Sequence, residues 1–339
     1  EHYKRGSFSI KIMHVKGDYN MKKALSMGLA LGLAAGCFSG AGITAAAEGT
    51  SDYVIGVLAP EVTHGWVAAV AYYAETRCKE MKESGEIKDY IIATSGNAED
   101  MTADLDDLLT QNVDAIVAYP QWDGMEASLQ RILDADIPLV CFDLQFDLDG
   151  YYLVTGDNKD MGVQGANYIF DKIGADGTVI ALTVPTAGSV NDLRMEGFYE
   201  QMEQLEQNWN VVEYATEFTR EAGLKDVADI LVNNPQIDAI YSLDDETSIG
   251  ALQAIKEAGR TDIKVITGGG GCQEYFNMMP EYEDINVASA TYSPAMVETA
   301  VDEAVQLLNG ESVEEKLVIP TTIVDKENYK DFLDPSSPY

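Results

Sequence analysis

The stretch YVIGVLA at residues 53–59 decides the fold of this chain. It is a short apolar run rich in β-branched residues, and the segment that follows at 66–83 has apolar residues spaced three and four apart. A second short run, DYIIAT, comes next at 89–94. Short apolar runs separated by helical segments are typical of parallel strands buried on both faces of a sheet. The stretch therefore predicts the first strand–helix–strand unit of an α/β protein.

The same alternation continues in two series. The first series adds DAIVAY (114–119) and IPLVCF (137–142), with helical segments at 99–112 and 123–134. The second series consists of TVIALTV (178–184), NVVEYATEF (210–218), DAIYSL (238–243), IKVITGG (263–269) and INVASATY (285–292). We predict two doubly wound, Rossmann-like α/β lobes with a ligand site in the cleft between them, beyond the carboxyl ends of the strands.

The charge of the chain excludes one class of partner. The 339 residues include 57 acidic and 22 basic ones, and the net charge is −35. Binding to nucleic acid requires a basic surface, so we expect no nucleic-acid partner. Adhesion to anionic lipid is disfavoured for the same reason. A solvated acidic surface that aids solubility is the simplest interpretation.

The N-terminal region is typical of an export signal. Met21, Lys22 and Lys23 precede the apolar segment ALSMGLALGLAAG at 24–36, and small residues at Ala45 and Ala47 precede Glu48. This order predicts a signal peptide at 21–47 that is cleaved before Glu48, with a transmembrane helix as the alternative. Residues 1–20 are expected to be an upstream or non-native segment. We expect the mature protein in the periplasm or at the outer face of the cell membrane.

A lipid anchor at Cys37 is a second possibility for the N-terminus. Cys37 follows LAAG, which is close to a lipobox. A typical lipobox has a large aliphatic residue three positions before the cysteine, where this chain has Ala34, and Leu33 comes one place too early. We therefore favour cleavage before Glu48.

Neither a metal nor a cofactor is expected. Cys78, Cys141 and Cys272 lie far apart and are expected to be buried thiols, with a single disulfide as the alternative. His64 is the one histidine after the predicted signal peptide, too few for a typical zinc site. The run GGGG at 268–271 lacks the Lys-Ser/Thr of a phosphate-binding loop. No G-x-S-x-G sequence occurs, and we expect no enzyme activity.

Aromatic and charged residues gather where the predicted strands end. The aromatic ones are Trp66, Tyr119, Trp122, Phe146, Phe218 and Tyr292. The charged ones are Asp143, Asp244, Asp245 and Arg194, the last in AGSVNDLRMEGFYE (187–200). Aromatic rings stack on the apolar face of a sugar, while carboxylates and a guanidinium bind its hydroxyls. The alternatives are core packing for each aromatic residue, and a surface ion pair with Glu196 or Glu200 for Arg194.

Several stretches, in this order, resemble one known family. They are ILDADIPLVCFD, VTGDNKDMGVQGANYI, GSVNDLRMEGF, DAIYSLDDETSIGALQAIKEAG and IKVITGGG. Over about residues 52–325 the chain resembles the periplasmic binding protein family of the ribose/galactose type, the substrate-binding components of sugar ABC transporters. The resemblance implies a monomeric, exported protein that captures a sugar or similar small hydroxylated ligand and delivers it to a membrane permease. Presentation of the ligand to a chemoreceptor or sensor kinase is the alternative.

The resemblance also implies the type I architecture, in which a three-strand hinge joins the lobes. The implied crossings lie near Gly156, Tyr292 and Pro320. The first lobe then comprises 52–156 plus 293–319, and the second comprises 157–292 plus 320–333.

Particular positions match the binding residues of the family. Arg194 matches an arginine that binds sugar hydroxyls, Trp66 and Phe218 match stacking residues, and Asp143 matches a carboxylate after the fourth strand. The other implied site residues are His64, Asn158, Asp244 and Tyr292, beside Tyr119, Trp122 and Phe146 from the strand ends.

Two departures from the family concern the ligand. Leu144 stands where many pentose and hexose binders have Arg, and Gly269 stands where a carboxylate is common. Bulk is added at Trp122, Phe142 and Phe146. We therefore expect a modified sugar, a polyol or another small hydroxylated molecule rather than a simple ribose-like ligand.

Overall fold

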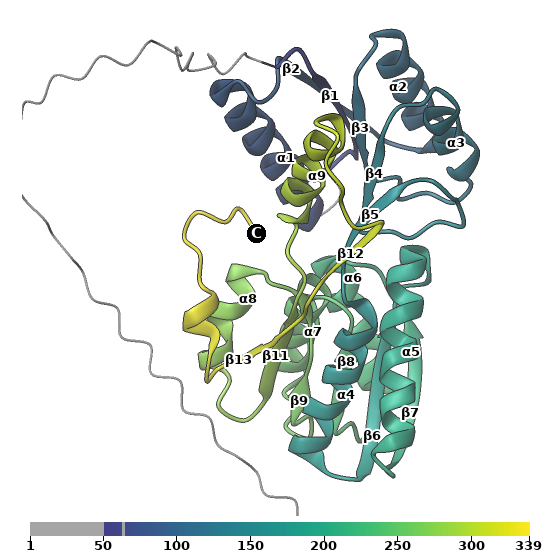
Figure 1. Cartoon of the computed structure of the whole chain (residues 1–339). Coiled ribbons are helices and arrows are strands. Elements are labelled where there is room, and N and C mark those ends of the chain that lie inside the picture. Colours follow the sequence, from purple (N-terminus) through teal and green to yellow (C-terminus); the bar gives the residue numbers. More distant parts are fainter. Residues whose placement is uncertain (1–50, 63–64) are drawn as a thin grey trace, which may run out of the picture. The chain divides into compact units, whose positions relative to one another are not determined.

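Two β-sheets with helices packed on their faces make up the part of the chain that the computed structural model describes, residues 51–62 and 65–339 (Figure 1). All of these residues belong to one compact unit, Glu48–Tyr339. The predicted signal segment 21–47, Cys37 and His64 lie outside the described residues. The prediction of an α/β protein with two lobes of parallel sheet is confirmed.

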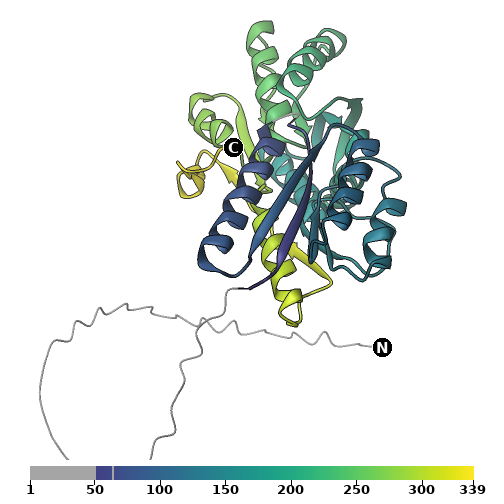
Figure 2. The ribbon, with the colours of Figure 1, turned by 90° about the horizontal axis from the view of Figure 1, so that it is seen from above.

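The first sheet has the strand order β12-β5-β4-β3-β1-β2, and its neighbouring strands pair in parallel. Its strands are β1 (Val54–Pro60), β2 (Asp89–Ser95), β3 (Ala115–Ala118), β4 (Leu139–Phe142), β5 (Tyr152–Gly156) and β12 (Lys316–Ile319). Its helices are α1 (Gly65–Ser84), α2 (Ala98–Thr110), α3 (Glu126–Asp134) and α9 (Met296–Leu308). Figure 2 shows the strands lying between α1 on one side and α2 with α3 on the other.

The alternation of side chains along β1 explains why this strand is apolar throughout. Ile55 and Val57 pack into the core on the side of α1. Leu58 points to the other face and packs with Leu105 and Met101 of α2. Because both faces of the strand are covered, each of its side chains needs an apolar partner.

The second sheet has the order β10-β11-β9-β8-β6-β7, and β13 pairs antiparallel with β11. Its strands are β6 (Asp176–Thr183), β7 (Asn208–Ala215), β8 (Ala239–Ser242), β9 (Val265–Ile266), β10 (Gly269–Gly270), β11 (Asn286–Thr291) and β13 (Ile323–Asp325). Its helices are α4 (Asn158–Ile173), α5 (Ser189–Gln204), α6 (Arg220–Asn233), α7 (Asp245–Ala258) and α8 (Gln273–Met278). Short 3-10 helices are η1 (Pro185–Ala187), η2 (Met279–Glu281) and η3 (Tyr329–Phe332).

The chain passes between the two sheets at three places. β5 ends at Gly156 and α4 begins at Asn158, β11 ends at Thr291 before α9, and β12 ends at Ile319 before β13. The predicted lobes, 52–156 plus 293–319 and 157–292 plus 320–333, remain a proposal, because strand pairing does not define which residues move together. Among the helices of the described residues, none is long and apolar enough to span a membrane.

Candidate ligand-binding site

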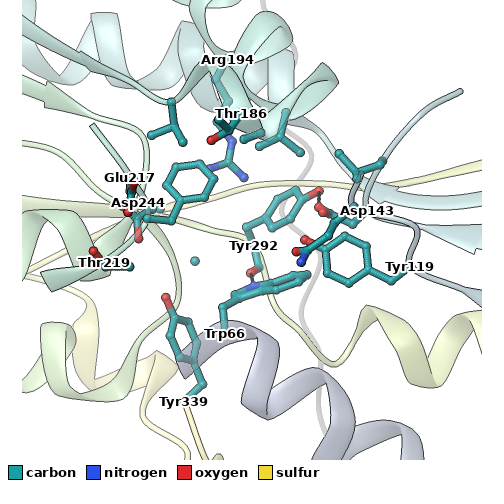
Figure 3. Close-up of a pocket in the computed structure, with 18 of the residues that line it drawn as sticks. Trp66, Tyr119, Asp143, Thr186, Arg194, Glu217, Thr219, Asp244, Tyr292 and Tyr339 are labelled. Atoms are coloured by element: carbon teal, nitrogen blue, oxygen red, sulfur yellow. Dashed lines mark hydrogen bonds between the residues drawn. The ribbon is translucent and has the colours of Figure 1, made fainter. Parts of the chain in front are cut away.

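A cavity of about 320 Å³ lies where the carboxyl ends of strands from both sheets meet (Figure 3). All of its lining residues except Tyr339 follow β1, β3, β4, β6, β7, β8, β9 or β11 in the sequence. The lining residues are Trp66, Tyr119, Gln121, Trp122, Asp143, Leu144, Val184, Thr186, Ala187, Val190, Arg194, Glu217, Phe218, Thr219, Asp244, Gly269, Gly270, Tyr292 and Tyr339. Ligands of parallel α/β sheets bind in this position.

The structure brings most of the predicted site residues together. The predicted residues that line the cavity are Trp66, Tyr119, Trp122, Asp143, Arg194, Phe218, Asp244 and Tyr292. Asn158 lies behind them and holds Arg194 through its side chain. Phe146 does not line the cavity but packs beside Tyr151, with ring centroids 6.4 Å apart, at the edge of the α2–α3 core. The core-packing alternative thus describes Phe146.

Arg194 is buried and held from two directions. Its Nε donates to Asn158 Oδ1 at 2.9 Å, and its Nη1 donates to the carbonyl oxygen of Leu243 at 2.6 Å. The guanidinium carbon lies 4.6 Å from the centroid of the Tyr292 ring. A guanidinium has five N–H donors, so these two bonds fix its orientation and leave donors for a ligand. Figure 3 shows the group pointing into the cavity.

The interpretation of Arg194 as a surface ion pair is wrong. Glu196 and Glu200 instead accept hydrogen bonds from Lys159 Nζ of α4, at 2.8 and 2.9 Å. Arg194 reaches the interior because α4 and α5 pack very closely. A Cβ on Gly162 would lie 2.1 Å from the carbonyl oxygen of Arg194, so only glycine permits this approach.

Asp143 accepts a hydrogen bond from the hydroxyl of Tyr292. That hydroxyl also accepts from Asn158 Nδ2 at 3.3 Å, which connects the Asp143 side of the cavity to Arg194. The backbone of Asp143 has a φ of 71°, a left-handed conformation that aspartate tolerates better than most residues. Burial raises the pKa of Asp143, although the hydroxyl of Tyr292 and the charge of Arg194 oppose the increase.

Three rings form a continuous aromatic wall. Trp66 lies edge-on to Tyr119 at a centroid distance of 5.8 Å and tilted against Tyr292 at 6.0 Å. Its indole Nε1 donates to the carbonyl oxygen of Tyr292 at 2.9 Å. Because the ring is oriented by both packing and a hydrogen bond, one face of the cavity is rigid and apolar.

The neighbouring carboxylates Asp244 and Asp245 have different tasks. Asp244 caps α7 by accepting from the backbone N–H groups of Glu246 and Thr247 at 3.0 and 3.1 Å, and it also lines the cavity. Asp245 points away and accepts from Gly271 N, Cys272 N and Ser289 Oγ, each at 2.9 Å. Burial raises the pKa of Asp244 to about 7 and that of Asp245 to about 6.

Other lining residues were not predicted. Glu217 and Thr219 flank Phe218 in the loop after β7, and Gln121 flanks Trp122 in the loop after β3. The only sequence signal for these three residues is that each is adjacent to a predicted site residue. Thr186 lies on η1, and Tyr339 lies far beyond the last strand, where the strand-end argument does not apply.

The cysteines do not contribute to the site. Cys78, Cys141 and Cys272 are buried free thiols, as predicted. Burial raises the pKa of both Cys78 and Cys272 to about 12, so both remain protonated at neutral pH. Among residues 51–62 and 65–339, no group of three or more His, Cys, Asp or Glu side chains is arranged to hold a metal ion.

Comparisons with known proteins show the family of the chain. The ribose import binding protein RbsB of Bacillus subtilis (strain 168) is 27% identical over 245 residues, which are 71% of this chain and 78% of that protein. The galactofuranose-binding protein YtfQ of Escherichia coli (strain K12) is 27% identical over 267 residues, 75% of this chain and 82% of that protein.

The crystal structure of a galactofuranose binding protein superimposes with a TM-score of 0.75 at 25% identity, covering 85% of this chain and 100% of that one. The family model described as "Periplasmic binding protein domain" matches residues 55–312. The chain therefore belongs to the periplasmic binding protein family, a family of binding proteins rather than of enzymes.

Proposed function

We propose that this protein captures a monosaccharide or a similarly small hydroxylated molecule in the cavity and delivers it to an ABC importer. The observation that carries the proposal is the composition of the cavity wall. A rigid aromatic face, centred on Trp66, lies across from buried hydrogen-bonding groups such as Arg194 and Asp244. The names of the relatives, which include ribose-binding and galactofuranose-binding proteins, support the same class of ligand.

The chemistry of the wall suits a sugar ring or a polyol. A pyranose or furanose presents C–H groups on its faces and hydroxyls at its edge. Aromatic rings cover the C–H faces, while carboxylates accept from hydroxyls and a guanidinium donates to them. Because these polar groups are buried, an unmatched ligand leaves them without partners, which makes binding selective.

The size and the departures from the family narrow the ligand. Ligand pockets occupy about 300–1,000 Å³, so a cavity of about 320 Å³ fits one small ring rather than an oligosaccharide. Leu144 and Gly269 both line the cavity, at the positions where related sugar binders commonly carry an arginine and a carboxylate. A ligand with fewer hydroxyls, or with an apolar substituent near Leu144, suits this wall better than ribose.

Delivery requires that binding change the shape of the protein. The groups of the cavity come from loops of both sheets, so a ligand that contacts both sides favours the closed arrangement over an open one. We propose that the predicted lobes rotate about the crossings near Gly156, Tyr292 and Pro320. The closed surface is then what the permease recognises, and the predicted signal peptide at 21–47 brings the protein to it.

A thermal-shift screen tests the proposal. The panel is D-ribose, D-allose, D-galactose, xylitol, myo-inositol and the deoxy sugars 2-deoxy-D-ribose and D-fucose, with L-leucine as a control that lacks hydroxyls. A ligand at 100 times its Kd stabilises the native state by about 2.7 kcal/mol, so a member that binds increases the Tm, and calorimetry then gives its Kd. If no member shifts the Tm or produces heat, the proposed ligand class is wrong.

Small-angle scattering tests the proposed closure. A saturating ligand should reduce the radius of gyration with little change within either lobe. Superimposable curves with and without a ligand that calorimetry shows to be bound contradict a closure driven by the ligand.

A further inference from the structure

Residues 334–339, the closing segment, connect helices of the two sheets. The segment follows η3, where Phe332 packs against Phe276 of α8 with ring centroids 6.5 Å apart. Asp334 N donates to Gln273 Oε1 of α8 at 2.7 Å. Further along, Ser337 Oγ accepts from the hydroxyl of Tyr73 of α1 at 3.1 Å. The segment thus leads from the second sheet to a helix of the first.

The closing segment has a defined conformation of its own. Asp334 Oδ1 accepts from both the backbone N and the Oγ of Ser336, at 2.8 and 2.6 Å. Its carbonyl oxygen accepts from Ser337 N at 3.1 Å. Pro335 and Pro338 restrict φ on either side of the turn. These constraints reduce the conformational entropy that the segment loses when Tyr339 is held in a fixed position.

That residue, Tyr339, has its ring in the wall of the cavity. The ring is buried, with an exposed fraction of 6%, and lines the same space as Trp66 and Asp244. A Cβ on Gly65 would lie 3.2 Å from Tyr339 Cδ2, and one on Gly270 would lie 2.8 Å from the Tyr339 hydroxyl. The ring therefore fits between the first residue of α1 and the glycine loop after β9.

The position of the ring is complementary to that of Arg194. Figure 3 shows Tyr339 and Arg194 on opposite sides of the cavity, with the tyrosine hydroxyl directed toward the side of Thr219 and Asp244. Within the described residues the hydroxyl makes no hydrogen bond. Burial raises its pKa well above the ordinary value, and the nearby carboxylates Asp245 and Asp244 add to the increase. The group is therefore a neutral phenol that can both donate and accept.

We propose that Tyr339 is a further ligand-binding residue, which bounds the cavity across from Arg194 and limits the ligand to a single small ring. The proposal rests on the proposed function of the cavity. The ring covers a C–H face or edge of the ligand, and the hydroxyl bonds to a ligand oxygen. The closing segment contacts α8 of the second sheet and α1 of the first. A ligand bound by Tyr339 therefore adds to the contacts that favour the closed form.

Variants at this position test the proposal by calorimetry. The probe is the panel member that binds the wild type most tightly, together with a disaccharide that carries that sugar at its non-reducing end. If the probe is a polyol, its mono-glucoside takes the place of the disaccharide. Tyr339→Ala should increase the Kd of the probe by about tenfold, as expected when an aromatic anchor is lost. It should also lower the ratio of the Kd of the larger compound to that of the probe, because the boundary of the cavity is removed. Tyr339→Phe should have a smaller effect.

Two controls separate binding from folding. Tyr72→Ala removes an exposed tyrosine of α1 and should leave both Kd values unchanged. If Tyr339→Ala does not fold, Tyr339→Leu retains apolar bulk without the ring and should show the same direction of change.

The possible results are distinct. If the wild type binds the probe and the Tyr339 variants bind both compounds with wild-type Kd values, this inference is overturned and the proposed function stands. If the wild type binds no member of the panel, the proposed function fails, and the inference fails with it. An increased Kd with a lowered ratio supports both.

Discussion

The segments after the strands of the first sheet contribute rings that pack against one another, whereas the segments after the strands of the second sheet contribute the polar groups of Arg194 and Asp244 beside apolar residues such as Phe218. Trp66 and Tyr119 are fixed by mutual contact, and Asp143 is already bonded to the hydroxyl of Tyr292. Arg194 and Asp244 instead keep bonding capacity beyond their contacts to Asn158, Leu243 and the start of α7.

This difference indicates that the first side, that of the first sheet, contributes mainly contact area and the second side mainly hydrogen bonds to the ligand. The rings of the first side are preformed, and the carboxyl of Asp143 already has a hydrogen-bond partner, so this side contributes contact area that costs little to organise. The second side holds buried polar groups with unused bonding capacity, and such capacity is costly unless a partner is present. Substitutions on the second side should therefore have the larger effects, and they should depend on charge.

The largest expected effect is that of Arg194→Ala. Removal of a buried, charged hydrogen-bonding partner should weaken ligand binding by about 2–4 kcal/mol. Calorimetry with the panel member that binds the wild type measures the loss, and circular dichroism verifies that the fold persists. Lys159→Ala is the matched control, because it removes an exposed cation at the same pair of helices. Equal losses in the two variants, or no loss in Arg194→Ala, contradict the assignment of Arg194 as a ligand-binding residue.

The raised pKa of Asp244 predicts that the stability of the protein depends on pH. Its pKa is raised from 3.8 to about 7 in the folded protein, so the folded state binds more protons than the unfolded state between these values. The free energy of unfolding should therefore decrease as the pH rises from about 4 to 7, by on the order of 3 kcal/mol from this group. Denaturant unfolding of the wild type and of Asp244→Asn measures it.

The Asp244→Asn variant should show a weaker pH dependence rather than none. The pKa values of Asp245 and Glu303 are also raised, to about 6 and about 7, and both groups remain in the variant. If wild type and variant have identical pH profiles, Asp244 is not a buried carboxyl of raised pKa.

Substitutions of Trp66 test the aromatic side of the cavity. Trp66→Ala should weaken binding by about 1–3 kcal/mol, because a central packed ring is lost. The tryptophan fluorescence of the wild type should also respond to the ligand. Because Trp122 also lines the cavity, the response is compared in a Trp122→Phe background. There it should persist when Trp209, whose ring lies in the core beside α5, is replaced by Phe, and it should disappear when Trp66 is replaced by Phe. A response that persists in Trp66→Phe shows that a tryptophan other than Trp66 reports the binding.

The smallest expected effect separates the two tasks of Asp244. Asparagine caps a helix about as well as aspartate, whereas alanine does not. Asp244→Ala should therefore be less stable than Asp244→Asn by about 1 kcal/mol at every pH, since both side chains are neutral. Urea unfolding of the two variants gives the difference. Equal stabilities show that the bonds to Glu246 and Thr247 contribute nothing to α7.

Much of the fold follows from periodicity alone. The strand at 53–59 and the helix at 66–83 correspond to β1 and α1 within one or two residues, because runs buried on both faces allow few other conformations. The strand predicted at 263–269 is instead divided into β9 and β10, with glycine at positions 268–271. Glycine offers no side chain that favours an extended ladder, so pairing with β11 decides where each part lies.

The order of several stretches indicated the family, and the sequence by itself determined the two α/β lobes and the strand ends at which most of the cavity residues lie. These follow from local patterns, because the carboxyl ends of parallel strands meet at one edge wherever the sheet forms. Only the tertiary structure decided that Trp122 lines the cavity while Phe146 packs beside Tyr151, that Arg194 is buried beside Asn158, and that Tyr339 returns to the site. The reason is that each of these depends on which side chains and helices are neighbours in space, and sequence spacing does not encode those neighbours across tens or hundreds of residues.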